Sequence, residues 1–246
     1  MLAELANKIE ELVKGQVEPT IEEINGVEYE KTAKGYSLLQ KTHTKYIEVN
    51  SLDGLVGMID AYLNETKDTD IKAPFIVNID FNNIQVMSAL GNDKIRNYLI
   101  EANPMIPNLE MGHRLTVEEL IILLSTSYVP TENTTKFINS LSSLRVVEEV
   151  EFNDDGIGQT VVAKQGASMN KSFQVQPIVK LQPIRSYAEI EQVESKFLFR
   201  VNKDGTVCLR DADGGQWKYE VQKRIFDYLK EKLNDLIEND LVRLIG

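Results

Sequence analysis

The spacing of apolar residues changes along this chain, and that change constrains the fold more than any other feature. Before about residue 145, most apolar residues recur every three or four positions, which is typical of helices, and short strands lie between them. From Val146 the apolar residues alternate at every second position, which is typical of strands. A last helical stripe begins at Trp217. This order predicts an α+β fold: a mixed or mainly antiparallel sheet built from hairpins, with helices on one face and a long C-terminal helix.

Five helices are expected from apolar residues at helical spacing: residues 1–15, 52–63, 116–124, 131–144 and 217–237. Asn50 or Ser51 is the expected N-cap of the second helix. Thr116 has a glutamate three residues later, and Asp213 has a glutamine at the same spacing. Both pairs predict capping boxes that start their helices.

Strands are expected where short apolar runs are bounded by turn-forming residues: 27–31, 46–49, 75–79, 84–87, 146–152, 157–163, 173–181, 197–201 and 207–209. Turns at 82–83, 153–156 and 202–205 predict three hairpins. Pro177 predicts an edge strand or a bulge, because proline lacks a backbone donor. Residues 98–102 fit either a strand or a helix.

The length of 246 residues fits one large domain or two small ones. We predict an N-terminal amphipathic helix over residues 1–15 and a single α+β domain over 16–246, with a subdivision near 145 as the alternative. The longest apolar runs are much shorter than the roughly 20 residues that cross a bilayer. The N-terminus also lacks the unbroken apolar run of a secretory signal. We therefore expect a cytoplasmic protein that does not insert into membranes.

The formal net charge of −11 argues against a nucleic-acid-binding surface, because such surfaces neutralise phosphates with Lys and Arg. Basic residues do gather near the C-terminus, but acidic residues are interleaved with them; they are Lys218, Lys223, Arg224, Lys230 and Lys232. That pattern predicts a solvated helix face with opposite-charge pairs. Direct contact with DNA remains an alternative.

Few residues in the chain suit a catalytic or cofactor site. The two histidines, His43 and His113, lie in unrelated segments, which leaves little material for a histidine metal centre or a catalytic triad. Cys208 lies in an alternating apolar stretch, which predicts a buried and inert thiol. Gly54 and Gly57 fall inside a predicted helix and do not form a phosphate loop. We expect no cofactor and no enzymatic activity.

The segment before the last helix contains the candidate ligand or interface residues: Asp211, Asp213, Gly214, Gly215 and Trp217. The simplest interpretation is a tight turn that leads into a capped helix, with Trp217 in the core. Helix N-termini bind anions, but the two carboxylates would repel one. The carboxylates could instead bind a divalent cation together with nearby glutamates, and the glutamates available are Glu189, Glu191 and Glu194. A metal-dependent hydrolase that uses Asp211 and Asp213 is therefore one alternative.

Five segments occur in an order that resembles a known protein family: residues 49–56 (VNSLDGLV), 156–164 (GIGQTVVAK), 179–185 (VKLQPIR), 191–200 (EQVESKFLFR) and 211–215 (DADGG). The chain resembles an uncharacterised family of phage and prophage proteins of Gram-positive bacteria, and it is more distantly similar to the YfdQ-like family of phage proteins. The resemblance covers most of the chain after Tyr46. It implies an origin in a phage genome, and it assigns no functional residue.

These features together predict a phage-encoded accessory protein that binds a host or phage protein, or a small ligand, in the cytoplasm of the bacterial host. Countering a host defence is one such role. The amphipathic terminal helices suit self-association, so a homo-oligomer is expected. The alternative is an accessory protein of phage DNA replication or recombination that contacts DNA directly.

Overall fold

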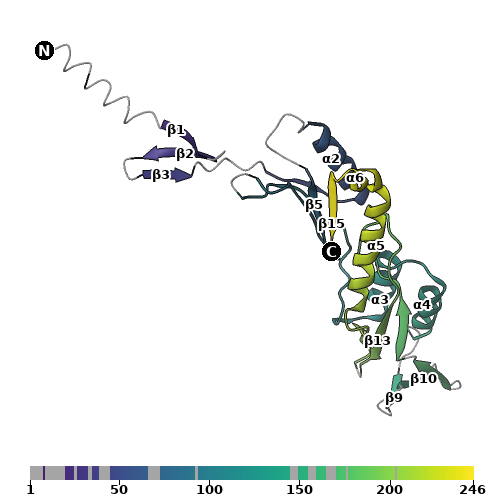
Figure 1. Cartoon of the computed structure of the whole chain (residues 1–246). Helices are drawn as coiled ribbons and strands as arrows, with labels where there is room; N and C mark the ends of the chain where they lie inside the picture. The colour runs from purple at the N-terminus through teal and green to yellow at the C-terminus, as the bar shows by residue number, and fades with distance from the viewer. Residues whose placement is uncertain are drawn as a thin grey trace.

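The computed structural model describes residues 8, 20–24, 27–32, 35–38, 45–65, 73–91, 94–144, 149–154, 159–164, 170–175, 177–202 and 204–246. Helices and mixed or antiparallel sheets are both present, which confirms the predicted α+β class (Figure 1). The described residues contain no helix that is long and apolar enough to span a membrane.

The largest sheet has five strands in the order β15-β5-β6-β7-β4. Its strands are β4 (Ile47–Val49), β5 (Phe75–Ile79), β6 (Ile84–Met87), β7 (Tyr98–Ala102) and β15 (Val242–Ile245). The three central strands are antiparallel, whereas β15 runs parallel to β5 and β4 runs parallel to β7. The sheet is therefore mixed.

Three helices cover one face of the five-stranded sheet: α2 (Leu52–Glu65), α5 (Gln216–Lys232) and α6 (Asn234–Glu238) (Figure 1). Leu55 and Ile225 on these helices pack with Phe75 and Val86 on the strands to form the first hydrophobic core. Side chains alternate across a strand, so the residues between the buried ones point to the opposite face. We call that face the outer face; it carries Asn78, Gln85, Met87, Tyr98 and Glu101. A register shift between β6 and β7 keeps Tyr98 and Glu101 on the same face although they are three residues apart.

A second, antiparallel sheet has four strands in the order β12-β13-β14-β8. They are β8 (Arg114–Leu115), β12 (Ile178–Leu181), β13 (Ser195–Val201) and β14 (Val207–Asp211). Helices α3 (Val117–Ser127) and α4 (Glu132–Leu144) pack together as the predicted helical hairpin. Leu120 and Leu141 on these helices meet Phe197 and Phe199 in a second hydrophobic core.

Two further sheets have three antiparallel strands each. The first contains β1 (Thr20–Ile24), β2 (Val27–Thr32) and β3 (Gly35–Leu38), and the second contains β9 (Glu149–Asp154), β10 (Gln159–Lys164) and β11 (Asn170–Val175). In the first sheet, hydrogen bonds from Tyr36 and Lys31 to Glu22 lower the pKa of that carboxyl.

The segment between β12 and β13 connects the two cores. The Gln192 side chain accepts backbone N–H bonds within the segment and so fixes its shape. The buried Tyr187 hydroxyl donates to the Ala102 carbonyl at the end of β7 at 2.7 Å. Glu189 accepts the Leu52 backbone N–H at the start of α2 at 2.7 Å. A segment that joins two strands of the second sheet thus holds a strand and a helix of the first.

Most predicted elements are confirmed. Thr116 and Glu119 form the predicted capping box at the start of α3. Ser51 accepts the Gly54 N–H at 3.0 Å and supplies the side-chain cap of α2. Residues 98–102 form a strand, and the predicted hairpins are present as β5–β6, β9–β10 and β13–β14.

The predicted capping box at the start of α5 is wrong. The N-cap is Gly215, which has a φ of 82° and no side-chain cap. Gly214 also lies in the left-handed region, with a φ of 68°. Two successive left-handed residues make a turn that glycine adopts readily. The turn brings the Asp213 carboxylate to the Gly215 N–H, at 2.9 Å, instead of to the third residue of the helix.

The predicted C-terminal helix is confirmed only in part. Its apolar stripe continues to residue 237, but α5 ends at Lys232, and the buried Leu233 separates it from α6. The chain then forms β15, which we did not predict, because its pairing with β5 depends on residues far away in the sequence.

Other predicted elements differ from the structure in their bounds or are described only in part. Asn153 and Asp154, predicted as turn residues, belong to β9. Residues 173–181 do not form one strand: β11 and β12 lie in different sheets. Of the predicted helix over residues 1–15, only Lys8 is described, and its backbone is helical. The predicted strand residues Val146 and Ile157, and Asp155 and Gly156 of the predicted turn, lie outside the described residues.

Candidate functional site

The predicted site residues Asp211 and Trp217 both contact Arg185, which the sequence analysis did not select. Only 5% of the Arg185 side chain is exposed, and one guanidinium nitrogen lies 2.9 Å from an Asp211 carboxylate oxygen. Another guanidinium nitrogen donates to the Ser195 hydroxyl, and the guanidinium lies 4.0 Å from the centroid of the Trp217 ring. We call this set the junction cluster; it comprises Arg185, Ser195, Asp211, Asp213 and Trp217.

The junction cluster touches both hydrophobic cores. Trp217 packs edge-on against Phe81, with ring centroids 5.5 Å apart, and Phe81 belongs to the turn between β5 and β6 of the first core. On the other side, the Arg185 guanidinium lies 5.7 Å from the ring of Phe197 in the second core. Arginine stacks on aromatic faces and pairs with a carboxylate at the same time. The cluster therefore joins the cores to each other.

The two aspartates of the junction cluster titrate as a pair. Burial and a hydrogen bond to Asp213 raise the pKa of Asp211. Burial also opposes ionisation of Asp213, but hydrogen bonds from Asp211, Ser195 and the Gly215 N–H outweigh it and lower the pKa of Asp213. The negative charge of the pair is thus held next to the Arg185 cation. The polar groups of the predicted site bond one another.

The described residues contain no group of three His, Cys, Asp or Glu side chains that could hold a metal ion. The glutamates considered as additional ligands lie at separate places. Glu189 caps α2, Glu191 lies 3.4 Å from Arg224, and Glu194 lies 3.6 Å from Lys180. His113 is exposed, and Cys208 is buried as expected. His43 lies outside the described residues.

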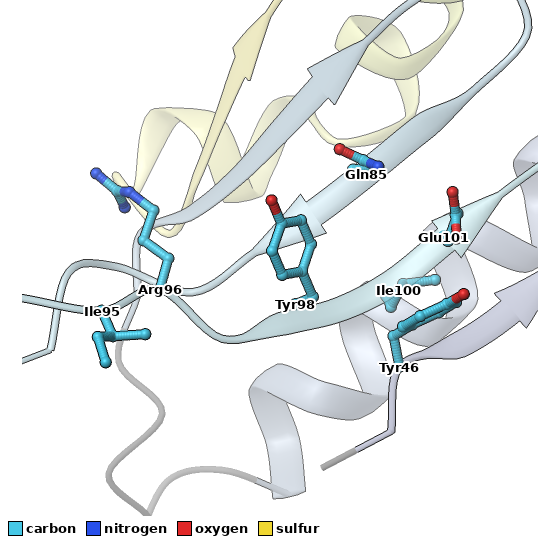
Figure 2. Close-up of a pocket in the computed structure, with 7 residues that line it drawn as sticks. All are labelled: Tyr46, Gln85, Ile95, Arg96, Tyr98, Ile100 and Glu101. Atoms are coloured by element: carbon cyan, nitrogen blue, oxygen red, sulfur yellow. The ribbon is translucent and has the colours of Figure 1, made fainter. Parts of the chain in front are cut away.

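A pocket lies on the outer face of the five-stranded sheet and encloses about 560 Å³. We call it the outer-face pocket; it is lined by Tyr46, Gln85, Ile95, Arg96, Tyr98, Ile100 and Glu101 (Figure 2). These residues come from β6, β7 and the segments just before β4 and β7. Its volume falls within the range of about 300–1,000 Å³ that is typical of ligand sites.

Residues of opposite charge lie at the two ends of the outer-face pocket. Arg96 and Ile95 precede β7, Tyr98 begins it, and Glu101 lies near its end beside Tyr46 (Figure 2). Tyr98 and Glu101 are three strand residues apart, which is about 10 Å. The charge of Glu101 and a hydrogen bond to it raise the pKa of the Tyr46 hydroxyl. The pocket therefore has a cationic end and an anionic end.

The sequence analysis missed the outer-face pocket because its residues look ordinary one by one. Gln85 and Glu101 occupy the polar positions of alternating strands, where solvent-exposed residues are expected. A large aromatic residue at an outward position is the one available signal, and Tyr98 is 54% exposed. The strand-or-helix ambiguity of residues 98–102 hid that signal.

Comparisons with protein-family models, with curated proteins and with solved structures give no match to this chain.

Proposed function

We propose that this protein is a non-enzymatic binding protein and that the outer-face pocket is its binding site for a protein partner. One observation carries the proposal: a pocket with two tyrosines and an arginine lies on a sheet face opposite the helical layer. Tyrosine and arginine are enriched where protein interfaces are energetically strongest. Half of the Tyr98 side chain is exposed, although burying it would be favourable.

A protein partner explains the surroundings of the pocket better than a small molecule does. An exposed apolar side chain lies beyond the pocket at its Arg96 end. Leu90 is 53% exposed in the turn where the Gly91 N–H bonds the Ile95 carbonyl. A small molecule that filled the pocket would leave this side chain in water, whereas a polypeptide lying along the outer face would cover it.

The order of sequence motifs that resembles phage proteins supports a partner from the phage or from its bacterial host. Inhibition of a host defence by such binding is one form of this proposal. The cytoplasm of the host is then the compartment where the partners meet. Binding to protein rather than to DNA is further supported by the net charge of −11.

Selection from a library of random dodecapeptides by messenger-RNA display, with the full chain immobilised, tests this proposal. We expect enriched peptides that bind the wild-type chain and fail to bind Tyr98→Ala. Tyr219→Ala is the matched control, because Tyr219 is a 77% exposed tyrosine on α5. Enrichment of no peptide, or equal binding to Tyr98→Ala and the wild type, would contradict the proposal.

A further inference from the structure

We infer that the partner segment carries an aspartate or glutamate that binds Arg96, next to an apolar side chain that packs on Tyr98. This inference rests on the proposed function, because it names the chemistry of the segment that would occupy the outer-face pocket. It follows from the charges and hydrogen bonds of the pocket, taken one end at a time.

At the cationic end, Arg96 is held in place, but its charge is not paired with a carboxylate among the described residues. One guanidinium nitrogen donates to the Ser88 carbonyl at 3.0 Å, and Ser88 is buried. Among the described residues, no carboxylate forms an ion pair with Arg96. The exposed guanidinium keeps further N–H groups, and its planar fork suits a carboxylate. Lys94, two residues earlier, adds another exposed positive charge.

At the anionic end, the carboxylate already has partners within the protein. Glu101 accepts a hydrogen bond from the Asn83 side chain at 2.7 Å, and Tyr46 also bonds it. The exposed Glu48 lies opposite Glu101 in the sheet register and adds negative charge there. An acidic side chain of the partner would be repelled at this end. The acidic residue of the partner is therefore assigned to the Arg96 end.

The middle of the pocket suits a polypeptide. The side chain of Gln85 and the hydroxyl of Tyr98 have no hydrogen-bond partner within the part of the chain that the structure describes. An amide and a phenol can bond backbone N–H and C=O groups of a bound segment. The Tyr98 ring offers an apolar surface, which fits an apolar side chain next to the acidic side chain of the bound segment.

The net charge of −11 does not prevent this binding, although it repels acidic molecules at long range. At physiological ionic strength, exposed charges are screened beyond about 8 Å. A carboxylate in contact with Arg96 is therefore governed by the local positive charge. Because contact charges in a partly open pocket are also screened, the affinity is expected to fall as salt is added.

The peptides selected above are sequenced, and the affinity of one of them for the chain is measured by fluorescence anisotropy. We expect Asp or Glu next to an apolar residue in the enriched set, and about a tenfold or larger loss of affinity in Arg96→Gln. Arg210→Gln is the matched control, because Arg210 is an exposed strand arginine in the other sheet. Arg96→Glu should in turn bind a peptide whose acidic residue is replaced by lysine.

Each other outcome overturns the inference. Peptides that lose binding in Tyr98→Ala but lack acidic residues and bind Arg96→Gln normally would overturn it and leave the proposed function standing. If benzoate bound the same site as tightly as the selected peptide, the occupant would be a small anion. Self-association of the wild-type chain that Arg96→Gln abolishes would make a second copy the occupant. Enrichment of no peptide would contradict the proposed function itself.

Discussion

The junction cluster and the outer-face pocket both place an arginine beside aromatic rings, but the two arginines are satisfied in opposite ways. Arg185 is buried, and it bonds Asp211 and Ser195 while it stacks on Trp217. Arg96 is exposed, and among the described residues its guanidinium bonds only a backbone carbonyl of its own loop. An arginine whose charge is neutralised inside the protein stabilises the fold, whereas one left without a carboxylate is available to a partner. The difference gives separate expectations for stability and for binding.

The largest expected effect is on stability at the junction cluster. Arg185→Ala leaves Asp211 without its cation and removes the stacking on Trp217, so we expect a loss of about 3–5 kcal/mol in the free energy of unfolding. Arg185→Lys should recover only part of it, because lysine cannot form the forked bonds or stack in the same way. Urea unfolding followed by circular dichroism measures both. A loss below about 1 kcal/mol would mean that the cluster does not hold the cores together.

Two buried tyrosines near the cores, Tyr187 and Tyr128, allow a matched comparison of smaller effects on stability. The Tyr187 hydroxyl donates to Ala102, so Tyr187→Phe is expected to destabilise the fold by about 1–2 kcal/mol. The Tyr128 hydroxyl is buried without a partner among the described residues, and burial raises the pKa of Tyr128 to about 12. Tyr128→Phe should therefore leave stability unchanged or increase it. The same urea experiment compares them, and equal losses in the two variants would argue against these hydrogen-bond assignments.

The pH dependence of stability sharpens the comparison further. The pKa of Asp213 is lowered in the folded protein, so its ionised form contributes stability above its ordinary value of 3.8 and loses it as the pH falls. The difference in thermal midpoint between wild type and Asp213→Asn should shrink from pH 7 to pH 3. Arg96→Gln changes an exposed side chain outside the junction cluster, so its small difference from wild type should not change. A difference for Asp213→Asn that grows towards pH 3 would contradict the direction of the shift.

The smallest stability effects are expected at the outer-face pocket. Tyr98→Ala and Arg96→Gln change exposed side chains, and each should alter the free energy of unfolding by no more than about 0.5 kcal/mol. Both should nevertheless impair peptide binding. Thermal unfolding of these variants beside Tyr219→Ala provides the check. A large destabilisation by Tyr98→Ala would indicate that Tyr98 serves the fold instead of a partner.

Much of the fold could be predicted from the sequence because it is encoded locally. The capping box at Thr116 and the turn residues between hairpin strands act within a few positions of each other. Strand β15 was missed because it depends on distant residues, since β5 offers it an edge. The helix start at Gly215 was missed for a local reason, because two successive left-handed glycines place the Asp213 carboxylate on the Gly215 N–H.

The candidate site divides in the same way. Asp211 and Trp217 could be selected by residue type, but their partner Arg185 is 26 residues before Asp211, so the pairing was not visible in the sequence. The outer-face pocket combines residues from near β4, β6 and β7, and only the sheet register brings them together. Sequence patterns identified residues whose side chains could bind a ligand or partner. The fold decided which of them are free to do so.

The most direct test of the central claim is a nuclear magnetic resonance titration of the isotope-labelled chain with one selected peptide. We expect amide chemical-shift changes concentrated in β4, β6 and β7, with those of residues 211–217 nearly unchanged. Shift changes concentrated around Asp211 and Trp217, with the outer face unaffected, would contradict the account and return the binding site to the junction cluster.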